Sequence, residues 1–380
     1  MFNFLLLINA ILGGILPLIF LNFSSLADVE LFVVFMVLLN CFFIIGGLGL
    51  DKHYFRSYNV IKGIDSFPKF YLLVALSSGF VALSSLHLFL NKWGLADLLL
   101  VYIFGAALML QRLNQIKLRY TLNVKTYFTS HILPKIIIIP VFYFAYGLHW
   151  SYGIFAVLIF ITNVSIIGNT KLKIIDHLYQ KSMWKYSLPF VFSGLLFWAI
   201  SNLDRIYLTF YEANYLAEYG YAISIANLLF FSQIFVTTRW LPSLLKKKEK
   251  QIWMEILLLG LGMLILLLCL LQISYLLKTM EVIKIFASID MPLLAIISCG
   301  VCLLAFQEII GGIDFKNKNS TNLMWSLAAG VSGGASLAAA LDSTNLYSGA
   351  IIFLSSTAIA LVFRILLIVR LVYKHRHGGF

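Results

Sequence analysis

The residues of this sequence best suited to chemistry are ionisable side chains that interrupt long apolar runs. They are Lys135, Asp204, Arg205 and Glu308 inside such runs, and Arg112, Arg239 and Arg364 close to the ends of others. A charged side chain at the centre of a bilayer costs roughly 2.5–3.5 kcal/mol, so such residues usually pair or face a polar interior. If the apolar runs cross a membrane, these residues mark a path for a polar substrate.

The signs of these charges suggest two roles. Cations beside a membrane cavity attract a phosphate or diphosphate group strongly. We therefore expect four of them to bind an anionic substrate, namely Arg205, Lys135, Arg112 and Arg239. The two acids, Asp204 and Glu308, are candidates for coupling transport to a proton or a sodium ion.

Each role has a simpler structural alternative. Asp204 and Arg205 are adjacent, about 100° apart on a helix, and could form a structural ion pair. The three arginines near the ends of runs could extend their long side chains to the membrane surface. Glu308 could join two helices by a hydrogen bond as readily as it could bind a proton.

Residues that interrupt or narrow a helix also fall inside the apolar runs. Pro17, Pro134 and Pro140 each remove a backbone donor, and we expect helix breaks there, which in transporters often border the binding site. A tolerated kink is the alternative. Gly330 and Gly334 have the GxxxG spacing that permits close helix approach, and we expect this face to pack against a neighbouring span of the same chain.

The composition requires a membrane around these residues. Of the 380 residues, 61% are hydrophobic and only 12% are charged, whereas about 25% are charged in typical soluble proteins. The mean hydropathy is +0.93. So few charges cannot cover a water-soluble surface, and the runs lack the period-two alternation of a membrane barrel. We predict an all-α integral membrane protein with about twelve transmembrane helices.

The twelve predicted spans are separated by short connections. They cover residues 3–21, 31–49, 70–90, 97–111, 128–148, 152–170, 187–210, 217–240, 253–275, 291–311, 322–341 and 347–369. Nearly all of the 28 Lys and Arg lie in every second connection or in the C-terminal tail, and the other connections hold only Lys92, Lys278 and Lys284. By the positive-inside rule, this alternation puts both termini in the cytoplasm. The net charge of +12 then reflects topology, and we expect no nucleic-acid partner.

A polar stretch divides the spans into two sets of six. Residues 171–186, KLKIIDHLYQKSMWKY, carry apolar side chains at roughly helical spacing, as in an amphipathic helix on the inner membrane surface. We predict an N-terminal six-helix bundle over 1–170, a cytoplasmic amphipathic linker over 171–186 and a C-terminal six-helix bundle over 187–380. Because six is even, both halves enter from the cytoplasm, which permits a parallel repeat.

Motifs of several enzyme classes are missing from the sequence. There is no G-x-x-x-x-G-K-[ST] loop for ATP, no H-E-x-x-H metal motif and no G-x-S-x-G nucleophile motif. The outer connections are too short to fold into a catalytic domain. We therefore expect a transporter and not an enzyme, with no cofactor and no metal site.

Four stretches around the seventh and eighth spans follow a distinctive order. They are SLPFVFSGLLFW from Ser187, SNLDRIYL from Ser201, YGYA from Tyr219 and LPSLLK from Leu241. A proline and a Trp are followed by the Asp-Arg pair, a Tyr-rich segment and a second proline. In this order the chain resembles the polysaccharide-transport family. That family contains the O-antigen and capsule repeat-unit flippases of the multidrug/oligosaccharidyl-lipid/polysaccharide exporter superfamily.

The resemblance implies two six-helix bundles that form a V around a central cationic cavity. It implies flipping of an undecaprenyl-diphosphate-linked oligosaccharide from the inner to the outer leaflet of the bacterial inner membrane, by alternating access coupled to an ion gradient. Membrane lipid and other polysaccharide-assembly proteins are implied partners. Asp204 and Arg205 match the family's Asp-Arg positions. The stretch from Leu21 to Ser25 departs from it, because the usual basic residue before the second span is absent.

Two other functions stay open at this point. A multidrug exporter of the same superfamily would need acidic cavity groups to attract cationic drugs, and here cations outnumber acids. An integral-membrane polysaccharide polymerase would need catalytic groups on an outer loop, and the acids of the outer connections have no long loop to arrange them.

Overall fold

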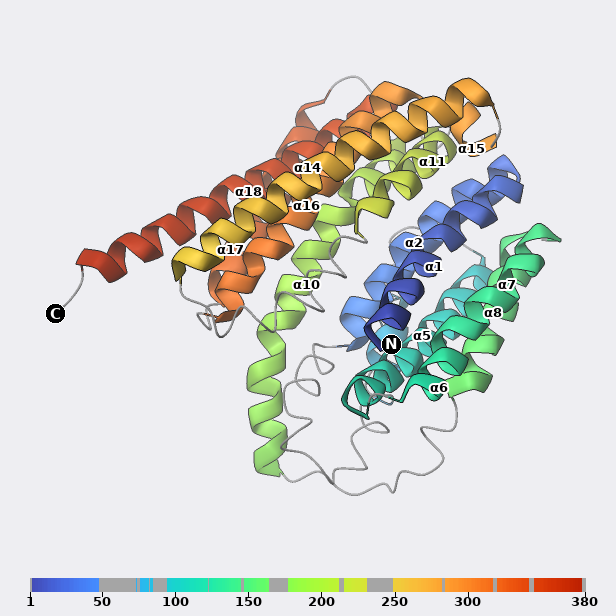
Figure 1. Ribbon diagram of the computed structural model, residues 1–380, viewed down its shortest axis with the longest axis horizontal. Helices are drawn as coiled ribbons and strands as arrows, with labels where there is room; N and C mark the ends of the chain where they lie inside the picture. The colour runs from blue at the N-terminus through green and yellow to red at the C-terminus, as the bar shows by residue number, and fades with distance from the viewer. Residues whose placement is uncertain are drawn as a thin grey trace. The chain divides into compact units, whose positions relative to one another are not determined.

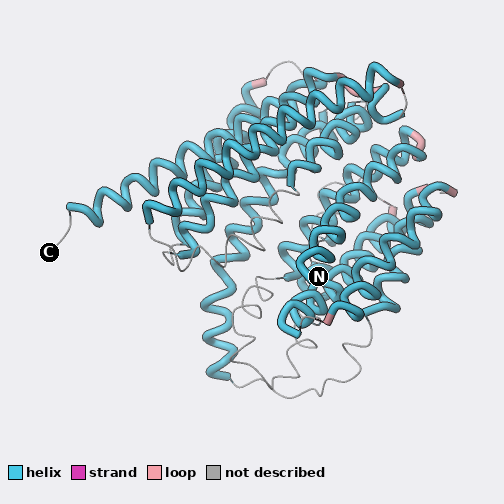
Figure 2. The backbone as a smooth tube through the Cα atoms, viewed as in Figure 1, coloured by secondary structure: helices cyan, strands magenta, loops and turns pink. Residues whose placement is uncertain are grey.

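The computed structural model describes most of the chain in two compact units. The described residues are 2–47, 73, 76–81, 83–84, 94–121, 123–144, 147–163, 177–211, 215–230, 249–281, 284–316, 320–341 and 345–377. Unit 1 is Met1–Trp198 and unit 2 is Ala199–Phe380. Every regular element among the described residues is a helix (Figure 2).

The described elements of unit 1 before α10 are long apolar helices and two short helical turns (Figure 1). They are α1 (Phe2–Phe23), α2 (Leu26–Gly47), α5 (Leu95–Thr121), α6 (Val124–Tyr127), the π-helical turn η1 (Phe128–Ile132), α7 (Leu133–Tyr143) and α8 (Leu148–Asn163). Helix α5 packs on α2 and α8, and α7 packs on α1 and α8. Helices α1 and α7, which carry Lys135 and the three predicted prolines, therefore pack against each other.

Unit 2 has the same all-helical construction. Its elements are the C-terminal part of α10 (His177–Tyr211), α11 (Leu216–Ala226), the short 3-10 turn η3 (Asn227–Phe230), α14 (Glu249–Met280), α15 (Lys284–Ala287), α16 (Met291–Lys316), α17 (Ser320–Ala340) and α18 (Leu346–His377). Helix α18 packs along both α16 and α17, and α16 also contacts α11 and α14. Tyr219 on α11 and Gly349 on α18 lie beside Asp204 on α10, so the neighbours of this residue come from distant parts of the sequence.

The core of unit 1 is a cluster of aromatic rings around Tyr152. The rings of Phe20 and Phe104 each meet Tyr152 edge to face, with ring centroids 5.3 Å apart in both pairs. The ring of Phe35 lies 5.2 Å from that of Tyr152 and the ring of Phe142 lies 5.5 Å from it. Edge-to-face and tilted pairs at these separations are the favourable aromatic geometries. The cluster joins α1, α2, α5, α7 and α8 into one body.

Small residues let the helices of unit 2 approach closely. A Cβ added at Gly330 would lie 2.7 Å from the Cβ of Ala360, and one added at Gly334 would lie 1.9 Å from Oγ of Ser356. The absence of a side chain at both glycines therefore sets the distance between α17 and α18. The prediction that the GxxxG face packs within the chain is confirmed.

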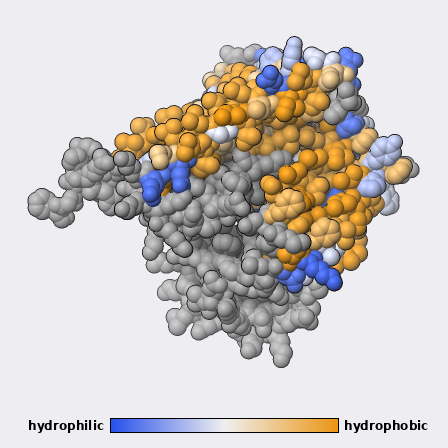
Figure 3. Space-filling model, in the orientation of Figure 1, coloured by the Kyte–Doolittle hydropathy of each residue, from blue (hydrophilic) through white to orange (hydrophobic). Residues whose placement is uncertain are grey.

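The surfaces of the described helices are those of a membrane protein. Six helices of the described residues are long and apolar enough to cross a bilayer, and Leu148–Asn163 and Met291–Gln307 are shorter apolar helices. Hydrophobic residues cover most of the visible helix faces, and hydrophilic residues gather near helix ends (Figure 3). The chain is a multi-pass membrane protein, and the count of twelve spans and the cytoplasmic termini stay predictions.

Several predicted segments fall partly outside the described residues. Most of the third predicted span (70–90) and the last ten residues of the eighth (217–240) lie outside the described residues. Helix α10 begins at His177 and runs to Tyr211, so it extends from the second half of the predicted linker through the seventh predicted span.

Candidate functional site

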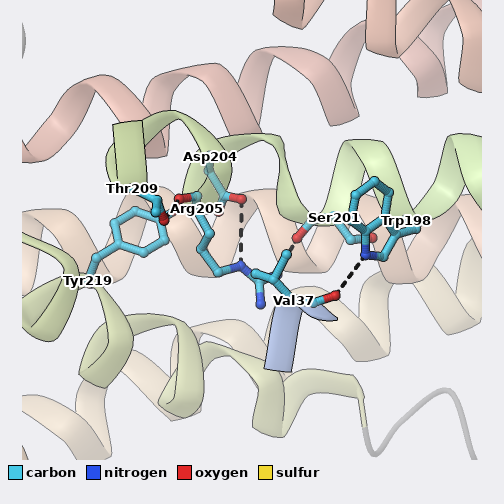
Figure 4. A network of polar contacts seen from close by, with 7 residues as sticks. All are labelled: Val37, Trp198, Ser201, Asp204, Arg205, Thr209 and Tyr219. Atoms are coloured by element: carbon cyan, nitrogen blue, oxygen red, sulfur yellow. Dashed lines mark hydrogen bonds and ion pairs between the residues drawn. The ribbon is translucent and has the colours of Figure 1, made fainter. Parts of the chain in front are cut away.

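Asp204 is a fully buried carboxylate on α10. Its side chain is 0% exposed, and the hydroxyl of Tyr219 on α11 donates a hydrogen bond to its Oδ2. Its Oδ1 lies 3.7 Å from Nε of Arg205, the next residue. That distance makes an ion pair without a hydrogen bond. Figure 4 shows Asp204, Arg205 and Tyr219 converging between the two helices.

Arg205 is also buried, at 7% exposed, and its guanidinium turns back along its own helix. Nη2 donates to the carbonyl oxygen of Ser201, one turn earlier. The carbonyl of Arg205 in turn accepts from Oγ1 of Thr209 at 2.6 Å. Five donors on a guanidinium give it capacity to bind an anion as well as its neighbours, because phosphate and carboxylate groups match its planar fork.

The adjacent charges form a neutral pair in a low-dielectric surrounding. Coulomb attraction between Asp204 and Arg205 is strong there, because little water screens it. Removal of one partner leaves a buried, unpaired charge, which is far more costly than removal of both. The geometry of Asp204 and Arg205 is compatible with two roles. They can form a permanent structural ion pair, or they can separate when a charged ligand binds to one of them.

Trp198 on α10 makes a polar contact within unit 1. Its indole Nε1 donates to the carbonyl oxygen of Val37 on α2 at 3.0 Å (Figure 4). The carbonyl of Val37 lies inside a helix, so the bond is additional to the backbone ladder of α2. The Trp that precedes the Asp-Arg pair in the sequence is thus fixed to a second helix.

Lys135 is a cation of unit 1 that lies within an apolar run. Its side chain is half-buried, and Nζ donates to the carbonyl oxygen of Asn9 on α1 at 2.8 Å. A Cβ added at Gly13, one turn further along α1, would lie 2.9 Å from the same Nζ. Gly13 therefore gives the amine room to approach the backbone of α1. Among the described residues, Lys135 thus binds a backbone carbonyl and forms no ion pair with a carboxylate.

Pro134, beside Lys135, leaves a carbonyl that other helices satisfy. Because its ring has no N–H, it cannot donate to the carbonyl oxygen of Ser130, four residues earlier. That oxygen accepts from Nε2 of Gln111 on α5 at 3.0 Å and from Nδ2 of Asn163 on α8 at 3.2 Å. Asn163 also accepts from Nδ2 of Asn114 at 2.8 Å. Re-satisfaction of a freed carbonyl by side chains is what allows proline inside membrane helices.

The other predicted site residues are distributed over both units. Pro17 lies inside α1 and Pro140 inside α7, and both helices continue through the proline. Arg112 follows Gln111 on α5 and its side chain is half-buried. Glu308 lies on α16, but its side chain is outside the described residues, as is the whole of Arg239.

The structure reveals site residues that the sequence reading missed or judged differently. Tyr219 appeared only within a Tyr-rich segment, yet it is the donor to the buried Asp204. Arg364 does not extend to the surface: it is 1% exposed, and its Nη1 donates to the carbonyl oxygen of Gln307 on α16 at 2.6 Å. The amide side chain of Gln307 is itself 1% exposed. Unit 2 thus holds a second buried cation besides Arg205.

Lys135 belongs to unit 1 and the Asp204–Arg205 pair belongs to unit 2. The central cavity that would unite them therefore stays a prediction. What each unit provides by itself is a buried or half-buried cation on an interrupted or polar helix. That arrangement suits an anionic group at membrane depth.

Solved structures of two membrane transport proteins share this fold. The lipid II flippase MurJ in an inward closed conformation aligns with a TM-score of 0.72 and 13% identity, over 97% of this chain and 87% of its own. The eukaryotic MATE transporter AtDTX14 aligns with a TM-score of 0.63 and 13% identity, over 97% of this chain and 94% of its own. No protein-family model and no curated protein matches the sequence. At this identity the likeness establishes the fold and leaves the substrate open.

Proposed function

We propose that the chain is a flippase for undecaprenyl-diphosphate-linked oligosaccharide repeat units of an O-antigen or capsule. It would move them from the inner to the outer leaflet of the bacterial inner membrane. The observation that carries the proposal is the fold, which is similar over 97% of this chain to that of a lipid II flippase. The order of residues around the Asp204–Arg205 pair supports the polysaccharide branch.

The buried cations supply the chemistry that such a substrate needs. A diphosphate carries its charge at the junction of lipid and sugar, so it must pass the hydrocarbon region. Arg205 and Lys135 would bind it there, with Arg112 and Arg239 nearer the cytoplasmic entrance. In this proposal two six-helix bundles, joined by the segment 171–186, alternate around the site. Membrane lipid and other polysaccharide-assembly proteins would be its partners.

Asp204 supplies a route to ion coupling. A proton or sodium ion that binds Asp204 would weaken its attraction for Arg205, and the guanidinium would then be available to the diphosphate. Glu308 on α16 is the second acid proposed for this role. Substrate and ion would thus bind opposite members of one ion pair, and binding of either one would favour binding of the other.

A strain of the source bacterium that lacks the protein tests the proposal. Undecaprenyl-linked glycans would be extracted and the surface polysaccharide separated on a gel. We expect complete single repeat units to accumulate on the inner leaflet and surface polymer to be lost. Surface molecules capped with one repeat unit would instead identify a polymerase, and normal polymer would remove this function.

Complementation with variants tests the site separately. Arg205→Gln and Lys135→Gln should restore little polymer, whereas Arg370→Gln at the exposed end of α18 should restore it fully. Because Arg205→Gln leaves Asp204 unpaired, the double variant Asp204→Asn with Arg205→Gln is included, which removes both charges. Full activity of the double variant would mean that the pair is structural and that the substrate binds elsewhere.

A multidrug exporter is the second candidate, because the fold is also similar to that of a MATE transporter. It predicts increased sensitivity of the deletion strain to cationic drugs, with unchanged polysaccharide. The two candidates therefore differ in both measurements.

A further inference from the structure

A buried histidine in unit 1 takes no part in the proposed flipping site. His131 lies in η1, the π-helical turn between α6 and α7, and is 2% exposed. π-Helical turns are rare and frequently occur at functional sites. Histidine is also the side chain whose charge changes most readily near neutral pH. The hydrogen bonds around its ring decide which protonation states the fold can hold.

Three hydrogen bonds run in a line through His131. On one side, Oγ of Ser130 lies 2.7 Å from Nδ1 of His131 and 2.7 Å from the carbonyl oxygen of Thr126. On the other side, Nε2 of His131 lies 3.1 Å from the carbonyl oxygen of Gln111 on α5. Both ends of the line are carbonyl oxygens, which only accept, so all three bonds together need three hydrogens. The Ser130 hydroxyl and a neutral imidazole have two, whereas the hydroxyl and an imidazolium have three.

We propose that His131 is a reversible proton-binding site. In the charged form, Nδ1–H donates to Ser130 and the Ser130 hydroxyl donates to the carbonyl of Thr126. In the neutral form, the hydroxyl turns and donates to Nδ1, and Nε2–H keeps its bond to Gln111. The carbonyl of Thr126 still has Oγ1 of Thr129 at 3.1 Å. A proton can thus enter or leave with the rotation of one hydroxyl, and the helices need not move.

The ring of Tyr127 favours the charged form. It lies parallel to the ring of His131, with centroids 4.5 Å apart and an interplanar angle of 10°. The face of an aromatic ring attracts a cation within about 6 Å of its centroid. The imidazolium would therefore have two hydrogen-bond acceptors in the ring plane and one aromatic face against it.

The charged groups on the surrounding elements oppose the extra charge. The elements that pack against η1 include α1, α5, α6, α7 and α8. Their titratable or charged residues toward this end are Lys135 on α7, Lys125 and Tyr127 on α6, and Arg112 on α5. Lys117, Arg119 and Tyr120 also belong to α5, but their side chains are outside the described residues, and α1 has no such residue. Those toward the other end are Asp97 and Tyr102 on α5, Tyr143 on α7, and His149 and Tyr152 on α8. Because the described charged side chains toward this end are cations, they favour release of the proton, whereas the ring of Tyr127 favours its binding.

The hydrogen bonds of His131 lie among contacts that join three helices. Gln111 accepts from the His131 ring, and its own Nε2 donates to the carbonyl oxygen of Ser130 at 3.0 Å. Asn163 on α8 donates to the same oxygen at 3.2 Å. Helices α5 and α8 are therefore hydrogen-bonded to η1 at Ser130, the residue whose hydroxyl rotates when His131 binds a proton. This proposal does not depend on the identity of the transported substrate.

The test uses the full chain in lipid nanodiscs with isotope-labelled histidine. Nuclear magnetic resonance of the ring nitrogens distinguishes the doubly protonated ring from either neutral tautomer. The signal of His131 among the seven histidines is identified by its loss in His131→Gln or, if that variant does not fold, in His131→Asn. We expect the doubly protonated ring at the low-pH end of a titration and the Nε2–H tautomer at the high-pH end.

Two neighbouring variants make the test specific. Ser130→Ala removes a charge-assisted hydrogen bond from the charged ring and a weaker one from the neutral ring, so the ratio of charged to neutral ring at a fixed pH should fall by up to about tenfold. Thr129→Ala removes the hydroxyl that still donates to the Thr126 carbonyl in the neutral form, so it should shift the ratio in the opposite direction, toward the charged ring. A ring that stays in one protonation state throughout the titration, or a ratio that ignores Ser130→Ala, would overturn the proposal. If the folded protein showed the expected titration of His131 but did not flip the substrate, the proposed function would be wrong and the proton-binding site would stand.

Discussion

The hydroxyl of Tyr219 donates to Oδ2 of Asp204 and so links α11 to α10 through a carboxylate that is 0% exposed. The other oxygen of that carboxylate faces Nε of Arg205 at 3.7 Å. Two other side chains therefore bind the carboxylate inside unit 2, Tyr219 by a hydrogen bond and Arg205 by an ion pair. Loss of either should be costly, because a buried carboxylate has no water to replace the missing partner.

Tyr219→Phe should destabilise the protein by about 1–3 kcal/mol, the usual cost of leaving a buried acceptor unsatisfied. The measurement is thermal or denaturant unfolding of the purified protein in one fixed detergent. Tyr221→Phe is a matched control on the same helix, because its buried hydroxyl has no hydrogen-bond partner among the described residues. That variant should be neutral or slightly stabilising. Equal loss in the two variants would contradict the role of the Tyr219 hydroxyl.

The buried arginine of α18 gives a second prediction. Arg364 is 1% exposed and donates to the carbonyl oxygen of Gln307 at 2.6 Å, whereas Arg370 is exposed on the same helix. Arg364→Met removes a charge-assisted bond between α18 and α16 and should lower stability by about 1.5–3 kcal/mol. Arg370→Met should change it by less than about 0.5 kcal/mol. Unfolding measurements on both variants compare the two positions directly, and a tolerated Arg364→Met would mean that apolar packing replaces the bond.

The contact between α17 and α18 gives a third prediction. A Cβ at Gly334 would meet Oγ of Ser356 at 1.9 Å, so Gly334→Ala should cost about 1–3 kcal/mol through overpacking. Adding Ser356→Ala removes the obstructing hydroxyl and should restore part of the loss. The recovery should be incomplete, because Cδ2 of Leu203 would still lie 2.8 Å away.

A glycine in open space is the control for this experiment. Gly262 on α14 has no atom within 4 Å of an added Cβ. Gly262→Ala should stabilise the helix by up to about 1 kcal/mol, through helix propensity alone. If Gly334→Ala behaved in the same way, the close approach of α17 and α18 would be wrong.

The sequence predicts features that follow from the free-energy cost of a residue type at a single position, such as a charge inside a membrane span. A charge in a long apolar run is expensive wherever it lies, and this reasoning singled out Asp204, Arg205 and Lys135, which are all buried or half-buried. The close approach at Gly334 was likewise predicted from spacing. Apolar composition predicted the helices, and six of the described ones meet the length and hydropathy of a span.

The sequence does not predict which side chains meet across helices. Tyr219 resembles any tyrosine of a Tyr-rich segment, and only the packing of α11 on α10 brings its hydroxyl to Asp204. Pro134 signals a freed carbonyl, but its donors, Gln111 and Asn163, come from two other helices. Arg364 lies near the end of an apolar run, where an arginine side chain usually extends to the membrane surface. It is buried instead because α16 lies beside α18. Contacts of this kind require the tertiary arrangement.

The approach of Lys135 to α1 gives the last prediction, which rests on the proposed function. Nζ of Lys135 donates to the carbonyl oxygen of Asn9, and a Cβ at Gly13 would lie 2.9 Å from it. Gly13→Ala should therefore displace the amine without removing its charge, because the end of a lysine side chain moves at little cost. Flipping should fall by several-fold, as expected for a misplaced substrate-binding group, while Lys135→Gln should abolish it. Repeat-unit accumulation in the complemented deletion strain measures both variants, with Gly262→Ala as the control. If Gly13→Ala flips normally while Lys135→Gln does not, the charge of Lys135 matters and its position against α1 does not.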